Sequence, residues 1–412
     1  MALGNIRIIM TSAFTKMFDS EGVVPNDVRP LRQTTHGSIQ GYFMESDGTL
    51  AEVYEAVPYA EPPTGLLRFE KTKELKSWNG TRDCGRNHMI QCVQFGDDFS
   101  GTEDCLYATI VLPHNDMKTG RRYPILIWLH GGSFQTGSAN IIPIEAMVKN
   151  FASNDIVLIS INYRLGPLGF LTASHRDLHG NYGLDDQIKA IEWIRANARN
   201  FDADPNNIIV GGMGAGAACA SILAISPKTK GLFNGVILRS GSVLAPWAVQ
   251  SVSTEDYSAQ LIDYCGCSYN QTLGMAHTVE CLKNVPIIKL QNGWRQIVKL
   301  TSTITGNGNF ILGSTYFTPV SDPFRIEASI LPGDPENVLI HNSRMPILIG
   351  VTNQEAAQWM SEFPVSSGRY LENGDWDLSH VIPPFFYANY KQVLFQKYFL
   401  TYKRSCSIFH IH

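Results

Sequence analysis

The chain has 412 residues, enough for one large domain or two ordinary ones. Hydrophobic residues make up 44% of it and charged residues 17%, which predicts a sizeable core and excludes a disordered chain. The net charge is −4 without a basic block, which argues against a nucleic-acid partner, and no run approaches the roughly 18 apolar residues of a membrane span.

The first 35 residues show no regular pattern and are expected to form an irregular N-terminal segment. Beyond them, short apolar runs bounded by Gly, Pro or polar residues predict buried strands at 125–129, 156–161, 208–210, 235–238 and 346–351. Residues 181–201 carry an apolar helical stripe, with aspartates early and arginines late, and a second helix is expected over 217–225. Buried strands that alternate with helices predict an α/β fold with a mostly parallel sheet covered on both faces.

The stretch "NIIVGGMGAGAACASILAI", residues 207–225, combines a strand, a glycine loop and a helix. "GMGAGA" matches the dinucleotide fingerprint, in which glycines let the backbone approach a pyrophosphate. That interpretation also requires an acidic residue about 20 positions further on, and no Asp or Glu lies between Asp204 and Glu255. Arg239 lies at the end of the next predicted strand, where an arginine could bind the 2′-phosphate of NADP. The motif alone therefore does not exclude an NADP-binding site.

The same stretch also matches the nucleophile elbow G-x-S-x-G of hydrolases, with glycine in place of the serine. Upstream, the strand at 125–129 runs directly into "HGGSFQTG", residues 130–137. Hydrolases place a glycine-rich loop there, and its backbone N–H groups face the developing oxyanion. The combination of both loops favours an elbow over a nucleotide site.

A string of further motifs shares this order. It comprises "VPYAEPPTGLLRF", "SWNG", "GTEDCLYATIVLP", "ILIWLHGGSF", "INYRLGPLGFL", "GNYGLDDQIKAIEWI", "DPNNIIVGGMGAGAA", "GVILRSGS" and "ILIGVTNQEA". With these motifs the chain resembles the type-B carboxylesterases, the family of the cholinesterases and of cholinesterase-like adhesion proteins such as neuroligins and gliotactin. The resemblance implies an α/β-hydrolase fold over residues 36–360, with 361–412 as a divergent, truncated C-terminal part of the same domain.

The resemblance assigns a role to several positions. The nucleophilic serine aligns with Gly214, which has no oxygen to acylate. The oxyanion hole aligns with Gly131, Gly132, Ser133 and Ala215, and the triad acid with Glu355. The remaining histidines after the acid, His380, His410 and His412, match no family motif, so the histidine position is expected to be absent, as in a fragment or a truncated isoform. Ser133, Ser240 and Cys219 are not expected to replace the missing nucleophile.

The eight cysteines form no zinc-site spacing, so no metal site is predicted. Composition alone leaves open whether they are free thiols or close short loops, Cys92 with Cys105 and Cys267 with Cys281, as in a secreted protein. The resemblance implies these two disulfides. The loop from 92 to 105 contains no tryptophan, the residue that supports choline binding in cholinesterases, which argues against a choline ester substrate.

Two hypotheses of different class follow. The first is a pseudoesterase that lacks its nucleophile and acts by binding another protein, with no cofactor. The second is a carboxylic ester hydrolase that uses a serine-type acyl transfer, as family membership implies. Asn79 and Asn270 begin N-glycosylation sequons, which together with the resemblance predicts a secreted or cell-surface protein, although the N-terminal residues carry no convincing signal peptide.

Overall fold

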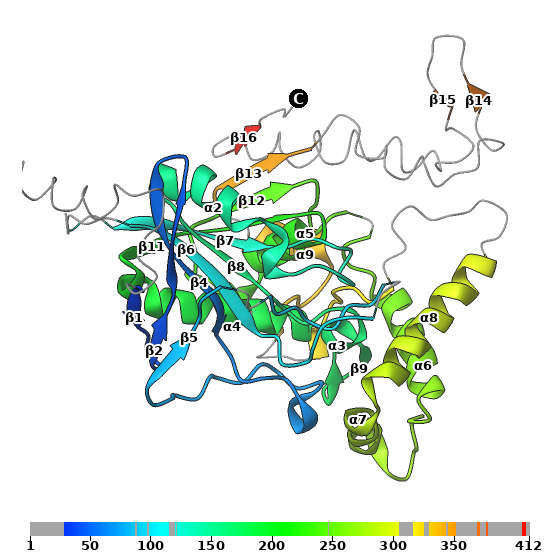
Figure 1. Cartoon of the computed structure of the whole chain (residues 1–412). Helices are drawn as coiled ribbons and strands as arrows, with labels where there is room; N and C mark the ends of the chain where they lie inside the picture. The colour runs from blue at the N-terminus through cyan, green and yellow to red at the C-terminus, as the bar shows by residue number, and fades with distance from the viewer. Residues whose placement is uncertain are drawn as a thin grey trace, which may run out of the picture.

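The computed structural model describes residues 29–86, 89–96, 99–114, 120, 122–245, 247–304, 316–324, 329–342 and 345–351, and the short strands at 369–370, 376–377 and 406–408. A nine-stranded sheet forms the centre of this part of the chain (Figure 1). In spatial order its strands are β16 (Cys406–Ile408), β13 (Ile347–Gly350), β12 (Gly235–Arg239), β11 (Ala203–Met213), β7 (Tyr123–Leu129), β8 (Val157–Ile161), β6 (Tyr107–Pro113), β4 (Thr49–Pro58) and β3 (Tyr42–Ser46).

The sheet is mostly parallel, which confirms the predicted class. The strands from β16 to β8 pair in parallel, whereas β6, β4 and β3 continue the sheet with antiparallel pairings. The antiparallel end begins with a hairpin, because Asp47 and Gly48 between β3 and β4 both have positive φ, the conformation that a tight two-residue hairpin turn needs.

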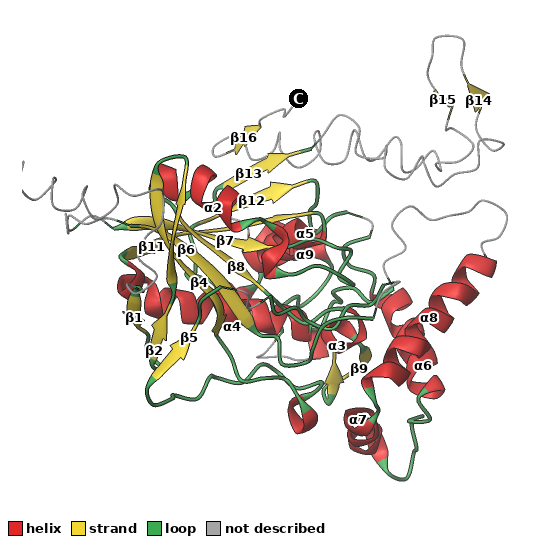
Figure 2. Ribbon diagram, viewed as in Figure 1, coloured by secondary structure: helices red, strands yellow, loops and turns green. Residues whose placement is uncertain are grey.

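The helices lie on both faces and at one corner of the sheet (Figure 2). They are α2 (Ile144–Asn150), α3 (Gly166–Phe170), α4 (Tyr182–Asn197), α5 (Ala215–Ile225), α6 (Ser251–Tyr264), α7 (Gly274–Asn284), α8 (Ile287–Ile304) and α9 (Pro335–Asn342). The corner is formed by α6, α7 and α8, beyond the carboxyl ends of the parallel strands. No helix in the described ranges has both the length and the apolar character needed to cross a bilayer.

The central strand β7 shows why the sheet needs two covers. Ile127 and Leu129 are fully buried in the larger core together with residues of α4 and α5. Leu126 and Trp128 point to the opposite face and join a smaller core with Met147 of α2. Successive strand residues alternate between faces, so an uninterrupted apolar run indicates a strand buried on both sides.

Several boundaries differ from the sequence-based expectation. Leu31–Gln33, at the end of the segment expected to be irregular, forms β1, which pairs with β2 (Ser38–Gln40), and β2 in turn pairs with β5 (Thr81–Asp83). β11 begins at Ala203, five residues before the expected start, and its pairing with β7 is irregular between Ala203 and Ile208. α5 begins at Ala215, two residues before the expected start. Within the C-terminal part, residues 361–412, β16 pairs with β13 at the edge of the sheet. Two further pairs complete the strands, β9 (Thr172–His175) with β10 (Leu178–His179) and β14 (Arg369–Tyr370) with β15 (Trp376–Asp377).

Candidate functional site

The turn between β11 and α5 has the backbone geometry of an elbow. Gly214 joins the strand to the helix with φ 55° and ψ −118°, a conformation that glycine adopts easily and that other residues adopt at a cost. Its N–H donates to the carbonyl of Arg239 on the neighbouring strand (2.9 Å), and its carbonyl accepts from Ala218 N–H (3.0 Å). A Cβ at this position would meet no described atom within 4 Å. The turn therefore points the position that would carry a side chain into open space.

The helix leaves the turn in close contact with the sheet. A Cβ on Gly216 would press into the carbonyl oxygen of Leu129, the last residue of β7, closer than a real side chain can approach. Glycine at this position lets the first turn of α5 cross the end of the strand. The contact at Gly216 thus positions the start of α5 against the sheet, and it does not involve a side chain at position 214.

The glycine loop after β7 lies against the same turn. A Cβ on Gly131 would stand 2.7 Å from the carbonyl oxygen of Met213, so the two loops meet backbone to backbone. Gly132, Ser133 and Phe134 then follow with φ of 111°, 54° and 62°, a run of left-handed conformations. Ser133 is exposed and Phe134 is fully buried. The structure therefore brings Gly131, the first of the positions aligned with the oxyanion hole, next to the turn that contains Gly214 and Ala215, and Gly132 and Ser133 follow it in the same loop.

His130, at the start of this loop, is a buried neutral histidine. It is 1% exposed and stacks on Tyr163, with ring centroids 4.4 Å apart. Its Nδ1 lies 2.9 Å from the carbonyl oxygen of Gly131, and Tyr163 donates its hydroxyl proton to the His130 carbonyl (2.7 Å). Burial lowers the pKa of His130 to about 4, so the ring is uncharged at neutral pH. These contacts give His130 a role in holding the loop, and the sequence motif alone did not reveal it.

Of the residues considered as replacement nucleophiles, Cys219 is enclosed in the core, whereas Ser133 and Ser240 lie in loops and have left-handed backbone, with φ of 54° and 52°. Cys219 is fully buried in α5, and burial raises the pKa of its thiol to about 12, which suppresses the thiolate that would attack an ester. Ser240 follows β12 and its N–H donates to the carbonyl of Gly350 (2.9 Å). Glu355, His380, His410 and His412 lie outside the described residues, so the geometry of a triad acid or base is not part of this site.

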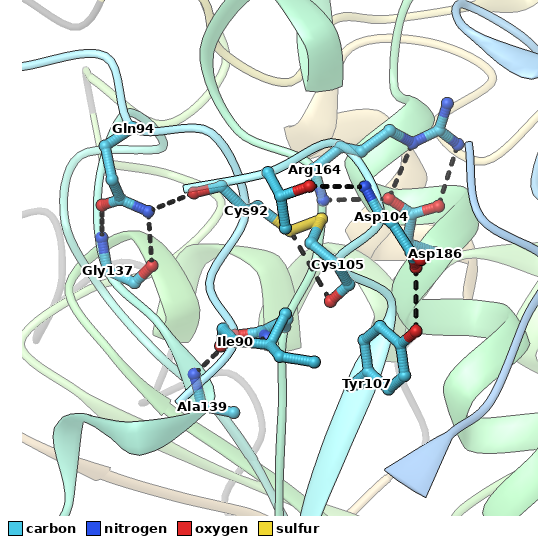
Figure 3. Close-up of a disulfide and its surroundings, with 12 residues drawn as sticks. Ile90, Cys92, Gln94, Asp104, Cys105, Tyr107, Gly137, Ala139, Arg164 and Asp186 are labelled. Carbon is cyan, nitrogen blue, oxygen red and sulfur yellow. Dashed lines mark hydrogen bonds and ion pairs between the residues drawn. A yellow bond between two sulfur atoms is a disulfide. The ribbon is translucent and has the colours of Figure 1, made fainter. Parts of the chain in front are cut away.

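A disulfide supports the glycine loop from the outside. Cys92 and Cys105 are bonded, and Gln94 connects their loop to the far end of the glycine loop (Figure 3). The Gln94 amide donates to the carbonyls of Cys92 (2.6 Å) and Gly137 (3.1 Å) and accepts from Gly137 N–H (2.7 Å). The second disulfide expected from the resemblance, Cys267–Cys281, is also present. The Cys92–Cys105 disulfide and Gln94 therefore help to hold the glycine loop in place.

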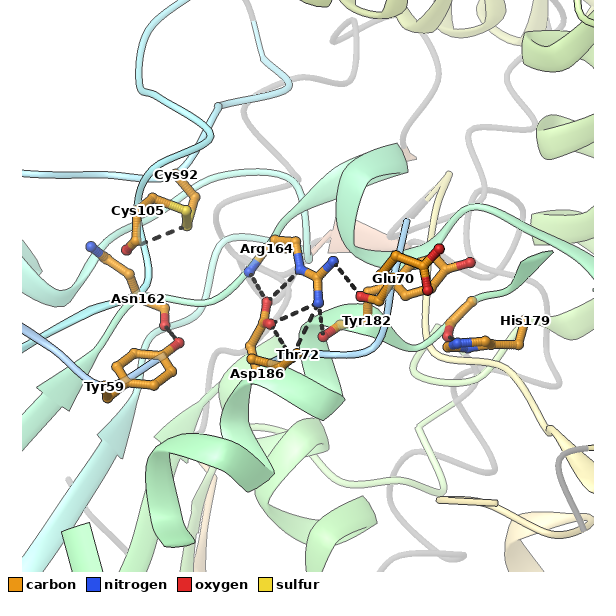
Figure 4. Close-up of polar contacts among 11 residues, drawn as sticks. Tyr59, Glu70, Thr72, Cys92, Cys105, Asn162, Arg164, His179, Tyr182 and Asp186 are labelled. Carbon is orange, nitrogen blue, oxygen red and sulfur yellow. Dashed lines mark hydrogen bonds and ion pairs between the residues drawn. A yellow bond between two sulfur atoms is a disulfide. The ribbon is translucent and has the colours of Figure 1, made fainter. Parts of the chain in front are cut away.

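A buried ion pair between Arg164 and Asp186 connects the loop after β8 to helix α4 (Figure 4). Arg164 donates from its backbone N–H and Nε to Asp186 Oδ2 (2.9 Å each) and from Nη2 to Oδ1 (2.8 Å). Thr72 donates its hydroxyl to the same carboxylate (2.5 Å), and Arg164 Nη1 donates to the carbonyl of Glu70 (2.9 Å). Since the side chains of the pair are 4% and 0% exposed, these bonds compensate charges that are removed from water.

A parallel sheet with helices on both faces, a strand–glycine turn–helix and an adjoining glycine loop together define an α/β-hydrolase fold. The chain belongs to the carboxylesterase family, whose family model matches residues 28–403. This membership supports the elbow interpretation of "GMGAGA".

Curated relatives agree with the family. The chain is 31% identical to Gut esterase 1 of Caenorhabditis elegans, over 85% of this chain and 57% of that protein. It is 32% identical to Venom carboxylesterase-6 of Apis mellifera, over 84% of this chain and 61% of the relative. Human Neuroligin-2 is 28% identical, over 81% of this chain and 42% of that protein. The chain thus spans less than two thirds of the length of these relatives.

Proposed function

We propose that this chain is a pseudoesterase, a carboxylesterase-family domain that has lost its nucleophile and acts by binding another protein. The observation that carries the proposal is Gly214, which occupies the centre of an elbow-shaped turn and has no oxygen to acylate. Acyl transfer of the serine type begins with attack by a side-chain oxygen, and without it the covalent step has no first atom. Burial of Cys219, a thiol on the helix that leaves the elbow, suppresses its thiolate and argues against it as a substitute.

We further propose that residues 36–360 form the carboxylesterase unit and 361–412 a divergent part of it, with Gly131, Gly132, Ser133 and Ala215 as a residual oxyanion loop and Glu355 at the acid position. The backbone contact between the glycine loop and the elbow supports the first assignment. Protein binding is the activity of the cholinesterase-like adhesion proteins that the sequence resembles. Neuroligin-2 among the matched relatives is consistent with it.

An ester-hydrolysis assay with 4-nitrophenyl acetate tests the loss of catalysis. We expect the purified chain to hydrolyse this ester no faster than a heat-inactivated sample. Turnover that disappears in Glu355→Ala and persists in Glu336→Ala, a matched change at an exposed carboxylate of α9, would contradict the proposal. That outcome would favour the second candidate, a carboxylic ester hydrolase, which the identity to proteins named as esterases supports.

A cell-binding assay tests the second half of the proposal. The fluorescently labelled chain is expected to bind cultured cells saturably, and mild proteolysis of the cells is expected to remove the binding sites. Binding that survives proteolysis, or that never saturates, would contradict a protein partner.

We also propose an extracellular location. Two disulfides suit an oxidising compartment, and the sequon residues Asn79 and Asn270 are both exposed, so an oligosaccharide can be attached without unfolding. Enzymatic removal of N-glycans from the secreted chain should increase its electrophoretic mobility in two steps. The variants Asn79→Gln and Asn270→Gln should each remove one step, and an unchanged mobility would contradict glycosylation.

A further inference from the structure

Three cysteines meet where α6 ends, and the family assignment gives one of them no role. Cys267 is bonded to Cys281 of α7, whereas Cys265, two residues earlier, is a free thiol. Cys265 and Cys267 are 4% and 3% exposed and belong to the same core, and Cys281 packs against that core from α7. A reduced thiol and a disulfide therefore share one buried turn.

The turn that holds them is a well-defined helix cap. Gly266 has φ 73° and its N–H donates to the carbonyl of Asp263 (2.8 Å), while Cys267 N–H donates to the carbonyl of Ile262 (3.0 Å). This pair of bonds around a left-handed glycine is the Schellman motif. The motif fixes the backbone on both sides of Gly266, so the separation between Cys265 and Cys267 is set by the cap.

The disulfide lies directly over the peptide that follows Cys265. Cys267 Sγ is 3.9 Å from the carbonyl oxygen of Cys265, and Cys281 Sγ is 3.9 Å from that of Gly266. Lys289 of α8 donates from Nζ to the Cys265 carbonyl (2.9 Å), which brings a positive charge to the same turn. Both sulfur atoms of the disulfide thus lie against backbone carbonyls of the turn that carries the free thiol, those of Cys265 and Gly266.

We propose that Cys265 and the Cys267–Cys281 disulfide form an intramolecular thiol–disulfide exchange site. The Cys265 thiolate attacks Cys281 Sγ, a Cys265–Cys281 bond forms, the Cys267–Cys281 bond breaks, and Cys267 leaves as a thiolate that takes up the proton released by Cys265. Two electrons move from one sulfur to another within the chain, so no external oxidant or reductant is consumed.

The inter-helix bond is the chemically reasonable product. A Cys265–Cys267 bond would close a small ring around Gly266 and would release α7 from the end of α6. A Cys265–Cys281 bond keeps the end of α6 tied to α7 and shifts the cross-link by two residues. The loop that contains Asn270 then gains the freed Cys267.

The surroundings of Cys265 set the rate of exchange. Burial raises the pKa of the Cys265 thiol, and the charge of Lys289 opposes this effect only in part. The thiol is thus largely protonated at neutral pH, and exchange is slow until the thiolate forms. This inference does not depend on whether the elbow is catalytic.

The test is a measurement of pairing in the unmodified chain. The folded protein is incubated under mildly alkaline, non-reducing conditions, quenched with acid, unfolded and labelled with a maleimide. Fragmentation of the peptide that contains Cys265 and Cys267 then shows which sulfur carries the label. We expect label on Cys267 in at least about one molecule in ten, which corresponds to pairings of similar free energy. Label on Cys265 alone, at every incubation time, would overturn the proposal.

Substitutions sharpen the result. In Cys267→Ser, we expect Cys265 and Cys281 to form a disulfide, and two free thiols in that variant would count against the exchange. In Cys265→Ser, only the Cys267–Cys281 pairing is expected. The matched control is Cys84→Ser, which removes another buried free thiol, and it should leave the label distribution of the native chain unchanged.

Discussion

Replacement of Gly214 by alanine measures directly whether the turn keeps its elbow geometry. At φ 55° and ψ −118° an L-residue is strained by about 1–3 kcal/mol. The added methyl group meets no described atom within 4 Å, so it contributes no steric term. Loss of glycine's freedom in the unfolded chain returns about 0.4–1 kcal/mol. Gly214→Ala should therefore destabilise the fold by between about 0 and 2.6 kcal/mol, with a midpoint of about 1.3 kcal/mol.

Urea denaturation monitored by tryptophan fluorescence provides the measurement, since a shift of the midpoint at constant slope reports the change in stability. Gly216→Ala is the matched comparison, because its Cβ would collide with the carbonyl of Leu129 and should cost at least about 3 kcal/mol. A stabilising Gly214→Ala would refute the positive φ at this turn. A cost equal to that of Gly216→Ala would refute the open space beside it.

Three further outcomes follow from the frame of the site. His130 has a folded-state pKa of about 4, below its unfolded value of 6.5, so its contribution to stability is complete above pH 6.5 and falls by about 3 kcal/mol between pH 6.5 and 4. In urea denaturation curves measured across that range, His130→Gln should weaken the dependence of the free energy of unfolding on pH. An unchanged pH dependence would assign it to other groups. Asp186→Asn should cost about 3–5 kcal/mol, because Arg164 stays buried without its counter-charge, and a cost below about 1 kcal/mol would contradict the buried pair. Cys92→Ser combined with Cys105→Ser should lower stability by about 3 kcal/mol through the reopened loop, as read from the midpoint of the same urea curves, and an unshifted midpoint would contradict a structural disulfide.

The features that sequence reasoning predicted are those with a local cause. The apolar runs of β7 and β8 are continuous because both faces of these strands are covered, and the stripe of α4 follows the helical period. The runs of β12 and β13 were also predicted, although Leu348 of β13 is exposed. The turn at Gly214 was predictable because a strand, a glycine and a helix follow one another along the chain. Its positive φ is a conformation that glycine adopts at little cost.

Other features depend on contacts between distant segments, so the sequence did not reveal them. The antiparallel strands β4 and β6 contain polar residues and a bulge, and their pairing connects segments far apart along the chain. Gln94 reaches Gly137 across 43 positions, and no local pattern marks an amide for that role.

The contacts at the elbow separate its shape from its chemistry. Gly216 packs closely against the carbonyl of Leu129, and Gly131 packs closely against the carbonyl of Met213. These backbone contacts position the helix and the glycine loop, and neither of them involves a side chain at position 214. Gly214→Ser should consequently fold as well as Gly214→Ala, within about 0.5 kcal/mol, because in both variants the added Cβ meets no described atom within 4 Å. A fluorophosphonate probe, which modifies activated serines, then reports on the rest of the machinery. Since the serine needs a base to become nucleophilic, a chain without a working histidine should fold with Ser at 214 and remain unmodified. Rapid modification of Gly214→Ser, absent from wild type, would instead show that a base is in place and that only the oxygen is missing.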